Sequence, residues 1–473
     1  MLKNKFLSLL KTLTLDELRE FDLHLTTCHS KKKIAIKVFK YILKFKPDYE
    51  DKALEKEVAF KKIFKKEPFN YRKIMNTVSD LNLVLEDFLV KLMLRQRKFE
   101  RDFLLLQHFR QRNADHLFDK KLKDLHKTLK QEGKIDFWHY LKKLQLNHAQ
   151  YYKISTEKLR PGQSSITEAM DHLDLFFIGA KLKYSCELLS RKHLLQEAAS
   201  INLLQATSEA YQNNEIMQTA YNELFHLAKL LITSDEVEYF YQLQERLRAN
   251  INWLGKVDIY ILSSYLINFT NLRIRRGSQH FIAKAFELYC FAIDHDALTV
   301  NGQLTSIRFY NIIDVACYLS KSGYLKNMDW PKKFVADWKD KIDEGKRDNV
   351  VLLAEAKISF EDKDFQKVTD LQLDITFENV IFSIRSKALS LMSFYELNEN
   401  NEFLDSQINA FNMFLKRNKI LNEKGKESSL NFIKAFKMLC KDKPKIAKLE
   451  QLIHSPAPMI CRNWLIEKVE NLK

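Results

Sequence analysis

Basic residues in the first quarter of the chain have the types and spacing that bind phosphate groups. They are the triplet Lys31, Lys32 and Lys33, the pairs Lys61, Lys62 and Lys65, Lys66, and Arg72 with Lys73. Lys and Arg neutralise phosphates, and a helix starting near residue 70 with Asn, Arg and Lys in its first turns suits a DNA groove. These residues are candidates for a contact with nucleic acid or anionic lipid. The interpretation that their spread favours is a set of solvated helix faces, where lysines are common.

Polar residues at helical spacing form a second set of candidates, in the later part of the chain. One stripe is Tyr260, Ser264, Asn268, Asn271 and Arg275, and another is Arg308, Asn311 and Tyr318. Asn and Arg side chains capture peptide backbones and carboxylates, so these stripes predict a surface that binds a partner. Solvated helix faces are the alternative. A third stripe, from Asn379 through Ser383, Ser386 and Ser390 to Ser393, is better explained by close helix packing.

Catalytic and cofactor motifs are not found. The nine glycines are dispersed and leave no phosphate-cradling loop, and no H-E-x-x-H or G-x-S-x-G occurs. Asp294, His295 and Asp296 are the only dense metal-capable run. Neighbouring helical residues point about 100° apart, so this run is interpreted as a helix cap rather than a metal site. We therefore expect no cofactor, no metal and no enzymatic activity, with an enzyme built from dispersed residues as a remote alternative.

The elements that position these residues are predicted to be helices throughout. The chain has 9 Gly and 7 Pro in 473 residues. Average usage of about 7% Gly and 5% Pro would give more than three times as many, and sheets and Rossmann folds need such turns. The six cysteines form no C-x-x-C pair, which predicts free thiols in a reducing compartment. Thr14 with Glu17 predicts a capping box that opens a helix.

The stretch 349–420 shows the helical pairing most clearly. Apolar residues recur at helical spacing up to Phe360, a polar link covers 361–364, and a return helix begins at Phe365. A second pair follows, with its break at 398–402. Because each helix has too wide an apolar face to be stable alone, the pairs must stack on their neighbours. Glycines at 277, 323 and 345 are expected to end earlier helices of the same series.

The hairpin at 349–375 resembles a tetratricopeptide repeat, a two-helix unit of about 34 residues. Counting back from Phe365, Ala356 falls where that repeat has a small residue, and Val368 falls at its next small position. The sequence departs from the repeat at Leu352, where the repeat has Trp, and at Lys363, where it has a turn glycine. The chain is also similar to an uncharacterised family of bacterial helical-repeat proteins. The resemblance implies a right-handed α-α solenoid whose concave groove, lined by the first helix of each pair, binds a peptide or partner protein.

Three regions are predicted. Residues 1–132 form a basic all-helical N-terminal bundle, residues 133–256 a helical middle region with a loop near 160–165, and residues 257–473 the repeats with a C-terminal capping helix. Residues 1–130 hold 31 Lys and Arg against 18 Asp and Glu, a net charge of +13 of the total +16. An anionic partner is therefore expected at the N-terminal region.

Two functions remain open from the sequence. The first is a non-catalytic interaction scaffold that binds a partner in the repeat groove. The second is a nucleic-acid-associated regulator that contacts DNA through residues 1–130, with an affinity that falls steeply as salt rises. No stretch approaches 18 apolar residues, so no transmembrane segment is expected, and the predicted location is the cytoplasm.

Overall fold

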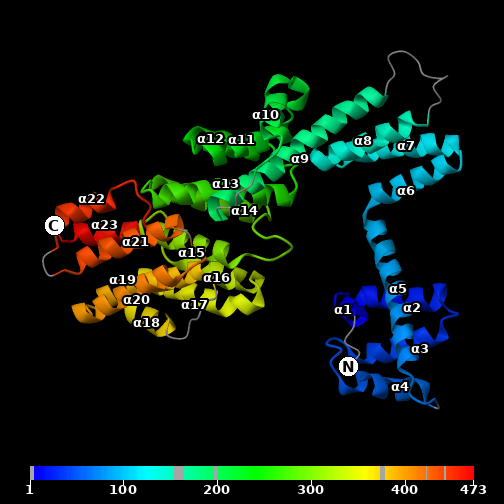
Figure 1. Ribbon diagram of the computed structural model, residues 1–473, viewed down its shortest axis with the longest axis horizontal. Coiled ribbons are helices and arrows are strands. Elements are labelled where there is room, and N and C mark those ends of the chain that lie inside the picture. The colour runs from blue at the N-terminus through cyan, green and yellow to red at the C-terminus, as the bar shows by residue number, and fades with distance from the viewer. Residues whose placement is uncertain are drawn as a thin grey trace. The chain divides into compact units, whose positions relative to one another are not determined.

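The computed structural model describes residues 5–65, 67–153, 165–195, 200–372, 379–421, 423–441 and 444–472 (Figure 1). These residues form twenty-three α-helices and no β-strand, which confirms the all-α prediction. Lys66 and most of the loop predicted at 160–165 lie outside the described residues. The six cysteines are free, with Cys186 and Cys317 buried and Cys28 exposed.

The chain divides into two compact units. The first comprises residues 1–132 and 148–163, and the second comprises residues 133–147 and 164–473. The helices of the first are α1 Lys5–Lys11, α2 Leu15–Cys28, α3 Lys33–Ile42, α4 Lys56–Phe64, α5 Tyr71–Gln96, α6 Lys98–Gln111 and α7 Asp115–Gln131. Helix α8, Phe137–Tyr151, begins in the second unit and ends in the first.

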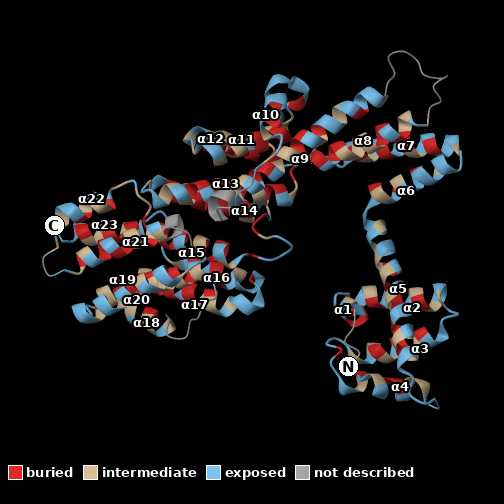
Figure 2. Cartoon of the chain, viewed as in Figure 1, coloured by how far each residue is buried: buried red, intermediate tan, exposed pale blue. Residues whose placement is uncertain are grey.

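Helix α5 is the centre of the first unit. Asn70 caps its N-terminus by accepting a hydrogen bond from the Lys73 amide at 3.0 Å. Its buried face, which includes Ile74, Leu81 and Phe88, packs against α1, α2, α3 and α4 (Figure 2). The capping box predicted from Thr14 and Glu17 opens α2.

The second unit is a series of helical pairs. Its helices are α9 Ser165–Leu195, α10 Leu204–Asn213, α11 Ala220–Ser234, α12 Val237–Ala249, α13 Lys256–Arg275, α14 His280–Asp294, α15 Ser306–Lys321, α16 Asp329–Trp338, α17 Glu344–Glu361, α18 Phe365–Gln372, α19 Val380–Glu396, α20 Asn401–Arg417, α21 Glu423–Leu439, α22 Ile446–Ile453 and α23 Arg462–Glu470. From α11 to α22, each odd-numbered helix is the first helix of a pair, and it packs on the even-numbered return helix that follows it.

Neighbouring pairs also pack on one another. The return helices α14, α16, α18 and α20 each contact the next first helix, and the first helices α11 and α13, α15 and α17, and α17 and α19 contact each other (Figure 1). One continuous buried cluster therefore extends from Phe137 to Val469. This stacking removes the apolar faces that no single helix of the series can bury alone.

The turns of the pairs share one backbone feature. A residue with positive φ follows the first helix in five of them, namely Asp235, Gly277, Gly323, Lys363 and Asn398. A left-handed residue at this position ends a helix and turns the chain back. Lys363 has φ +64° at the position where a tetratricopeptide repeat has glycine. Gly345 departs from the prediction, because it lies in the first turn of α17 after the capping residue Asp343 and does not end α16.

Candidate functional site

The first stripe of polar residues lies along one face of α13. Tyr260, Ser264, Asn268, Asn271 and Arg275 follow one another at intervals of three or four residues, which is the repeat of an α-helix. Apolar residues such as Leu262, Leu266 and Phe269 on the rest of the helix are buried in the core of the second unit. The core therefore fixes the direction in which the stripe points.

Arg308, from the second stripe, connects α15 to α13. Its side chain is 9% exposed, and its guanidinium lies over the Tyr260 ring at 4.0 Å from the ring centroid. It also donates hydrogen bonds to the Ser264 hydroxyl and, at 3.5 Å, to the Leu298 carbonyl. The guanidinium is thus held in one orientation by an aromatic face and two acceptors, none of which carries a negative charge.

Arg385, on α19, reaches the same region and was missed by the sequence analysis. Its Nη2 donates to Asn311 Oδ1 at 2.5 Å, and its guanidinium lies 4.7 Å from the centroid of the Tyr310 ring. Its Nη1 is buried and has no hydrogen-bond partner among the described residues. In the sequence Arg385 stands beside the serine stripe of α19, and nothing there indicates that it faces Asn311, 74 positions earlier.

Tyr289, on the return helix α14, lies near enough to Arg308 and Arg385 to feel their charges. Its side chain is fully buried, and its hydroxyl has no partner of ordinary hydrogen-bond geometry in the described part of the chain. Burial raises the pKa of Tyr289 to about 12, while Arg308, Arg385 and the nearby amides of Asn271 and Asn311 act in the opposite direction. The hydroxyl is therefore a protonated, unfilled donor at neutral pH.

Arg275 completes the group at the end of α13. Its side chain is exposed, and desolvation by nearby protein atoms, followed by the charge of Arg385, lowers the pKa of the guanidinium. Among the described residues the guanidinium has neither an ion pair nor a hydrogen bond. We call the set Asn271, Arg275, Tyr289, Arg308, Asn311 and Arg385 the arginine cluster. It has three cations, and no described carboxylate forms an ion pair with any of them.

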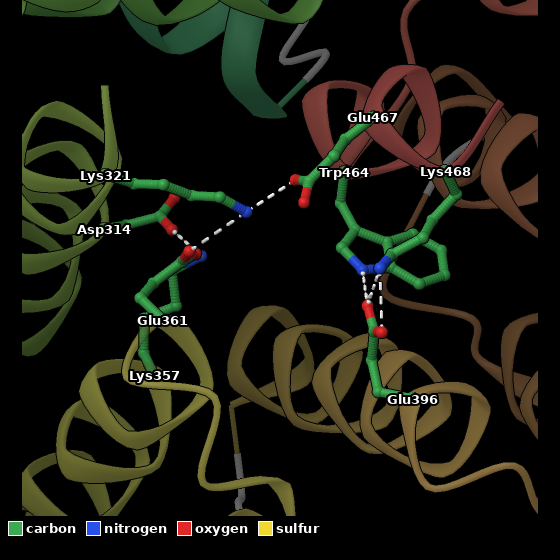
Figure 3. A network of polar contacts seen from close by, with 8 residues as sticks. All are labelled: Asp314, Lys321, Lys357, Glu361, Glu396, Trp464, Glu467 and Lys468. Atoms are coloured by element: carbon green, nitrogen blue, oxygen red, sulfur yellow. Dashed lines mark hydrogen bonds and ion pairs between the residues drawn. The ribbon is translucent and has the colours of Figure 1, made fainter. Parts of the chain in front are cut away.

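Two lysines of the second unit, Lys357 and Lys321, are paired with carboxylates. Lys357 Nζ lies 3.1 Å from Asp314 Oδ1 and 2.8 Å from Glu361 Oε1 (Figure 3). Burial acts to lower the pKa of Lys357, but the attraction of Glu361 and then Asp314 outweighs it and raises this pKa well above its usual range. Lys321 in turn pairs with Glu467 of α23 at 2.5 Å. Unlike these two lysines, the three arginines of the arginine cluster have no carboxylate counterion among the described residues.

The C-terminal helix α23 lies against the ends of several first helices. Glu396, at the end of α19, accepts hydrogen bonds from Trp464 Nε1 at 2.7 Å and Lys468 Nζ at 2.8 Å (Figure 3). Arg462 donates to the Arg275 carbonyl at 3.2 Å and to the Ser455 carbonyl at 2.8 Å. Its Cδ lies 3.7 Å from where a Cβ on Gly277 would stand. The last helix therefore holds the end of α13 next to the arginine cluster.

The remaining residues of the two stripes lie outside the arginine cluster. Asn268 is exposed on α13, and the Tyr318 hydroxyl donates to Gln279 Oε1 at 3.3 Å. In the third stripe, Ser390 and Ser393 donate to carbonyls one turn earlier in their own helix. His295 is the C-cap residue of α14, as predicted for the run from Asp294 to Asp296.

The predicted basic residues of the first unit lie on its surface. Lys31, Lys32 and Lys33 are exposed at the turn into α3, Lys61, Lys62 and Lys65 are exposed on and after α4, and Arg72 is exposed at the start of α5. Lys73 pairs with Glu67 at 2.5 Å and lies over the Phe64 ring. Lys66 lies outside the described residues. Apart from Lys73, the described residues of this set are solvated side chains at the C-terminal end of α4 and at the starts of α3 and α5.

Comparison of this chain with protein-family models, curated proteins and solved structures gives no match. Within the described parts of the chain, no helix is both long enough and apolar enough to cross a membrane. No group of three described His, Cys, Asp or Glu residues is arranged to hold a metal ion.

Proposed function

We propose that this protein is a non-catalytic interaction scaffold. In this proposal the helical pairs form a tetratricopeptide-like, right-handed solenoid, and a partner protein or peptide binds along the polar faces of the first helices. The observation that carries the proposal is the arginine cluster, where α13, α15 and α19 present three guanidinium groups that have no carboxylate counterion within the described chain. Arginines without internal counterions favour an external anionic partner.

The test is affinity capture from native lysate with the full-length protein, followed by mass spectrometry. A partner should be recovered with the wild type and lost with Asn268→Trp, because Asn268 is exposed on the polar face of α13 and an indole there blocks that face. Lys416→Trp is the matched control, since Lys416 is exposed on the return helix α20. A partner that binds all three proteins equally, or no partner for the wild type, would contradict the proposal.

A nucleic-acid-associated regulator is the second candidate. It is favoured by the exposed lysines at 31–33, 61, 62 and 65, and by a net charge of +13 in residues 1–130. Duplex DNA should then bind the full-length protein, and replacement of Lys31, Lys32 and Lys33 by Gln should weaken binding and reduce its salt dependence. Equal DNA binding by the wild type and the triple variant would exclude a role for this triplet.

A further inference from the structure

The arginine cluster combines positive charge with donors that the protein leaves unfilled. Arg385 Nη1 and the Tyr289 hydroxyl are buried without a partner among the described residues. The exposed Arg275 guanidinium has no hydrogen bond or ion pair within the described chain either. Buried donors in folded proteins are nearly always satisfied, so those that are not indicate a group missing from the structure. Since Arg has donors only, that group must be an acceptor.

The orientation of two of the guanidinium groups, those of Arg308 and Arg385, is fixed before any ligand arrives. Arg308 lies over Tyr260 at 4.0 Å and Arg385 over Tyr310 at 4.7 Å, and Ser264 and Asn311 accept hydrogen bonds from them. These neutral supports hold the planar groups without neutralising them. A ligand bound there gains charge-assisted hydrogen bonds without the entropy loss of ordering long side chains.

The number of charges indicates the class of ligand. A single carboxylate would neutralise one of the two guanidinium groups that have free donors, Arg275 and Arg385. A phosphate monoester carries about −1.5 to −2 charges at pH 7 and has three terminal acceptor oxygens. Arginine is also the residue most suited to planar, two-bond recognition of phosphate. We propose that the arginine cluster is a binding site for a phosphate monoester, contacted by Arg275, Arg385 and the Tyr289 hydroxyl. On the proposed function, which this inference deepens, the group is a phosphorylated side chain of the partner.

Isothermal titration calorimetry of the full-length protein, at an ionic strength of about 0.15 M, tests the site. The probes are phenyl phosphate, inorganic phosphate and acetate. Phenyl phosphate should bind the wild type, and Arg275→Gln should weaken it about tenfold, the loss expected for one charge-assisted contact. Arg276→Gln is the matched control at the C-cap of the same helix, because Arg276 is ion-paired with Asp235, and it should bind as the wild type does.

Arg275→Gln is the primary variant because its side chain supports no other contact, so it should fold as the wild type does. Arg385→Lys keeps the charge but removes the planar group, and it should also bind phenyl phosphate more weakly. The inference is overturned if acetate binds as tightly as phenyl phosphate, if neither phosphate probe binds, or if Arg275→Gln and Arg276→Gln behave alike.

Two further probes separate this inference from the proposed function. A phosphoserine tripeptide with blocked ends and adenosine monophosphate carry the same phosphate monoester group, one on a peptide and the other on a nucleoside. Tighter binding of the peptide supports both proposals. Tighter binding of the nucleotide supports the phosphate site but contradicts a peptide-binding scaffold at this site. If a partner is captured in an Asn268-dependent way but no phosphate probe binds, the scaffold proposal is supported and the phosphate site is excluded.

Discussion

Arg275 shows at the level of one residue how a binding site can lower the stability of the protein that carries it. Its side chain is exposed and has no described counterion, and desolvation, followed by the charge of Arg385, lowers the pKa of the guanidinium. The folded protein therefore holds a repulsion that an anion would relieve. Arg308 and Arg385, in contrast, are each supported by an aromatic ring and an uncharged acceptor.

Arg275→Gln should increase the free energy of unfolding in the absence of phosphate. The gain should be small, about 0.3 kcal/mol, because solvent screens a partly exposed charge. Thermal melts at low salt should show it, and 0.5 M sodium chloride should remove it. The same variant should lose the stabilisation that phenyl phosphate gives the wild type. A lower melting temperature at low salt would show that Arg275 stabilises the fold.

His226 predicts a pH dependence. It is 6% exposed, it stacks on Tyr211 with centroids 4.4 Å apart, and its Nδ1 has no described partner. Burial, followed by the charge of Lys229, lowers the pKa of His226 from its usual 6.5 to about 4. Between these values the unfolded state binds the proton more readily. His226 therefore leaves stability intact above pH 6.5 and reduces it as the pH falls toward 4.

His226→Phe should remove this loss while retaining a ring against Tyr211. Near pH 7 the variant and the wild type should unfold at similar denaturant concentrations. At pH 5 the variant should be more stable by about 2 kcal/mol, the value for 1.5 units of pH below the unfolded pKa. Urea titrations at both values measure this, with His116→Phe on the exposed surface of α7 as the control. If the free energy of unfolding depends on pH in the same way for the wild type and His226→Phe, His226 does not cause the loss of stability at low pH.

At the level of elements, the turns between paired helices depend on one left-handed residue each. Glycine fills this position at 277 and 323, whereas Lys363 fills it between α17 and α18. A non-glycine residue in this conformation costs roughly 1–2 kcal/mol, and glycine avoids that cost. Lys363 is exposed.

Lys363→Gly should stabilise the second unit by about 1 kcal/mol, because the strain removed exceeds the extra flexibility that glycine gives the unfolded chain. Lys363→Ala should not, since alanine keeps the Cβ that causes the strain. Chemical denaturation of the two variants compares them directly. Equal stability of the Gly and Ala variants would mean that the lysine is unstrained.

The C-terminal helix α23 depends on Glu396 for its polar attachment. The Glu396 side chain is 15% exposed and binds Lys468, which is 16% exposed, together with the indole of Trp464. Glu396→Ala leaves the Lys468 charge half-buried without its partner and should destabilise the attachment by about 2 kcal/mol. Amide hydrogen exchange should accelerate in residues 462–470. Glu399→Ala, in the exposed turn after α19, is the control and should leave that exchange unchanged.

At the level of the whole molecule, most of the described buried hydrophobic residues belong to one of two separate clusters. One extends from Phe6 to Phe88, and the other from Phe137 to Val469. Because no described buried residue belongs to both, each cluster should unfold as its own cooperative transition. The basic candidates lie on the first unit, and the arginine cluster lies in the second.

Core truncations should therefore affect one transition at a time. Phe39→Ala, in the first cluster, and Phe309→Ala, in the second, each empty a fully buried site and should cost about 3–5 kcal/mol. Scanning calorimetry should show a different transition lowered in each variant. If either substitution lowers both transitions together, the two units unfold as one.

Sequence patterns alone determined the helices and much of their pairing. Scarce glycine and proline predicted the all-α class, and local signals such as Thr14 with Glu17 and the break after Phe360 located helix ends correctly. These features depend on residues within a turn or two of one another, so periodicity and capping rules can predict them. Gly345 was misplaced because a glycine is tolerated in the first turn of a helix, where the preceding cap Asp343 decides the start.

The arginine cluster was decided by tertiary structure. The sequence identified Asn271, Arg275, Arg308 and Asn311 as polar positions on two helices, but it gave no reason to add Arg385 or Tyr289. Arg385 meets Asn311 only because successive helical pairs stack, and Tyr289 belongs to a return helix whose pattern indicated only core packing. Whether a charge has a counterion depends on neighbours distant in sequence, so no local pattern could show that Lys357 is neutralised while Arg275 and Arg385 are not.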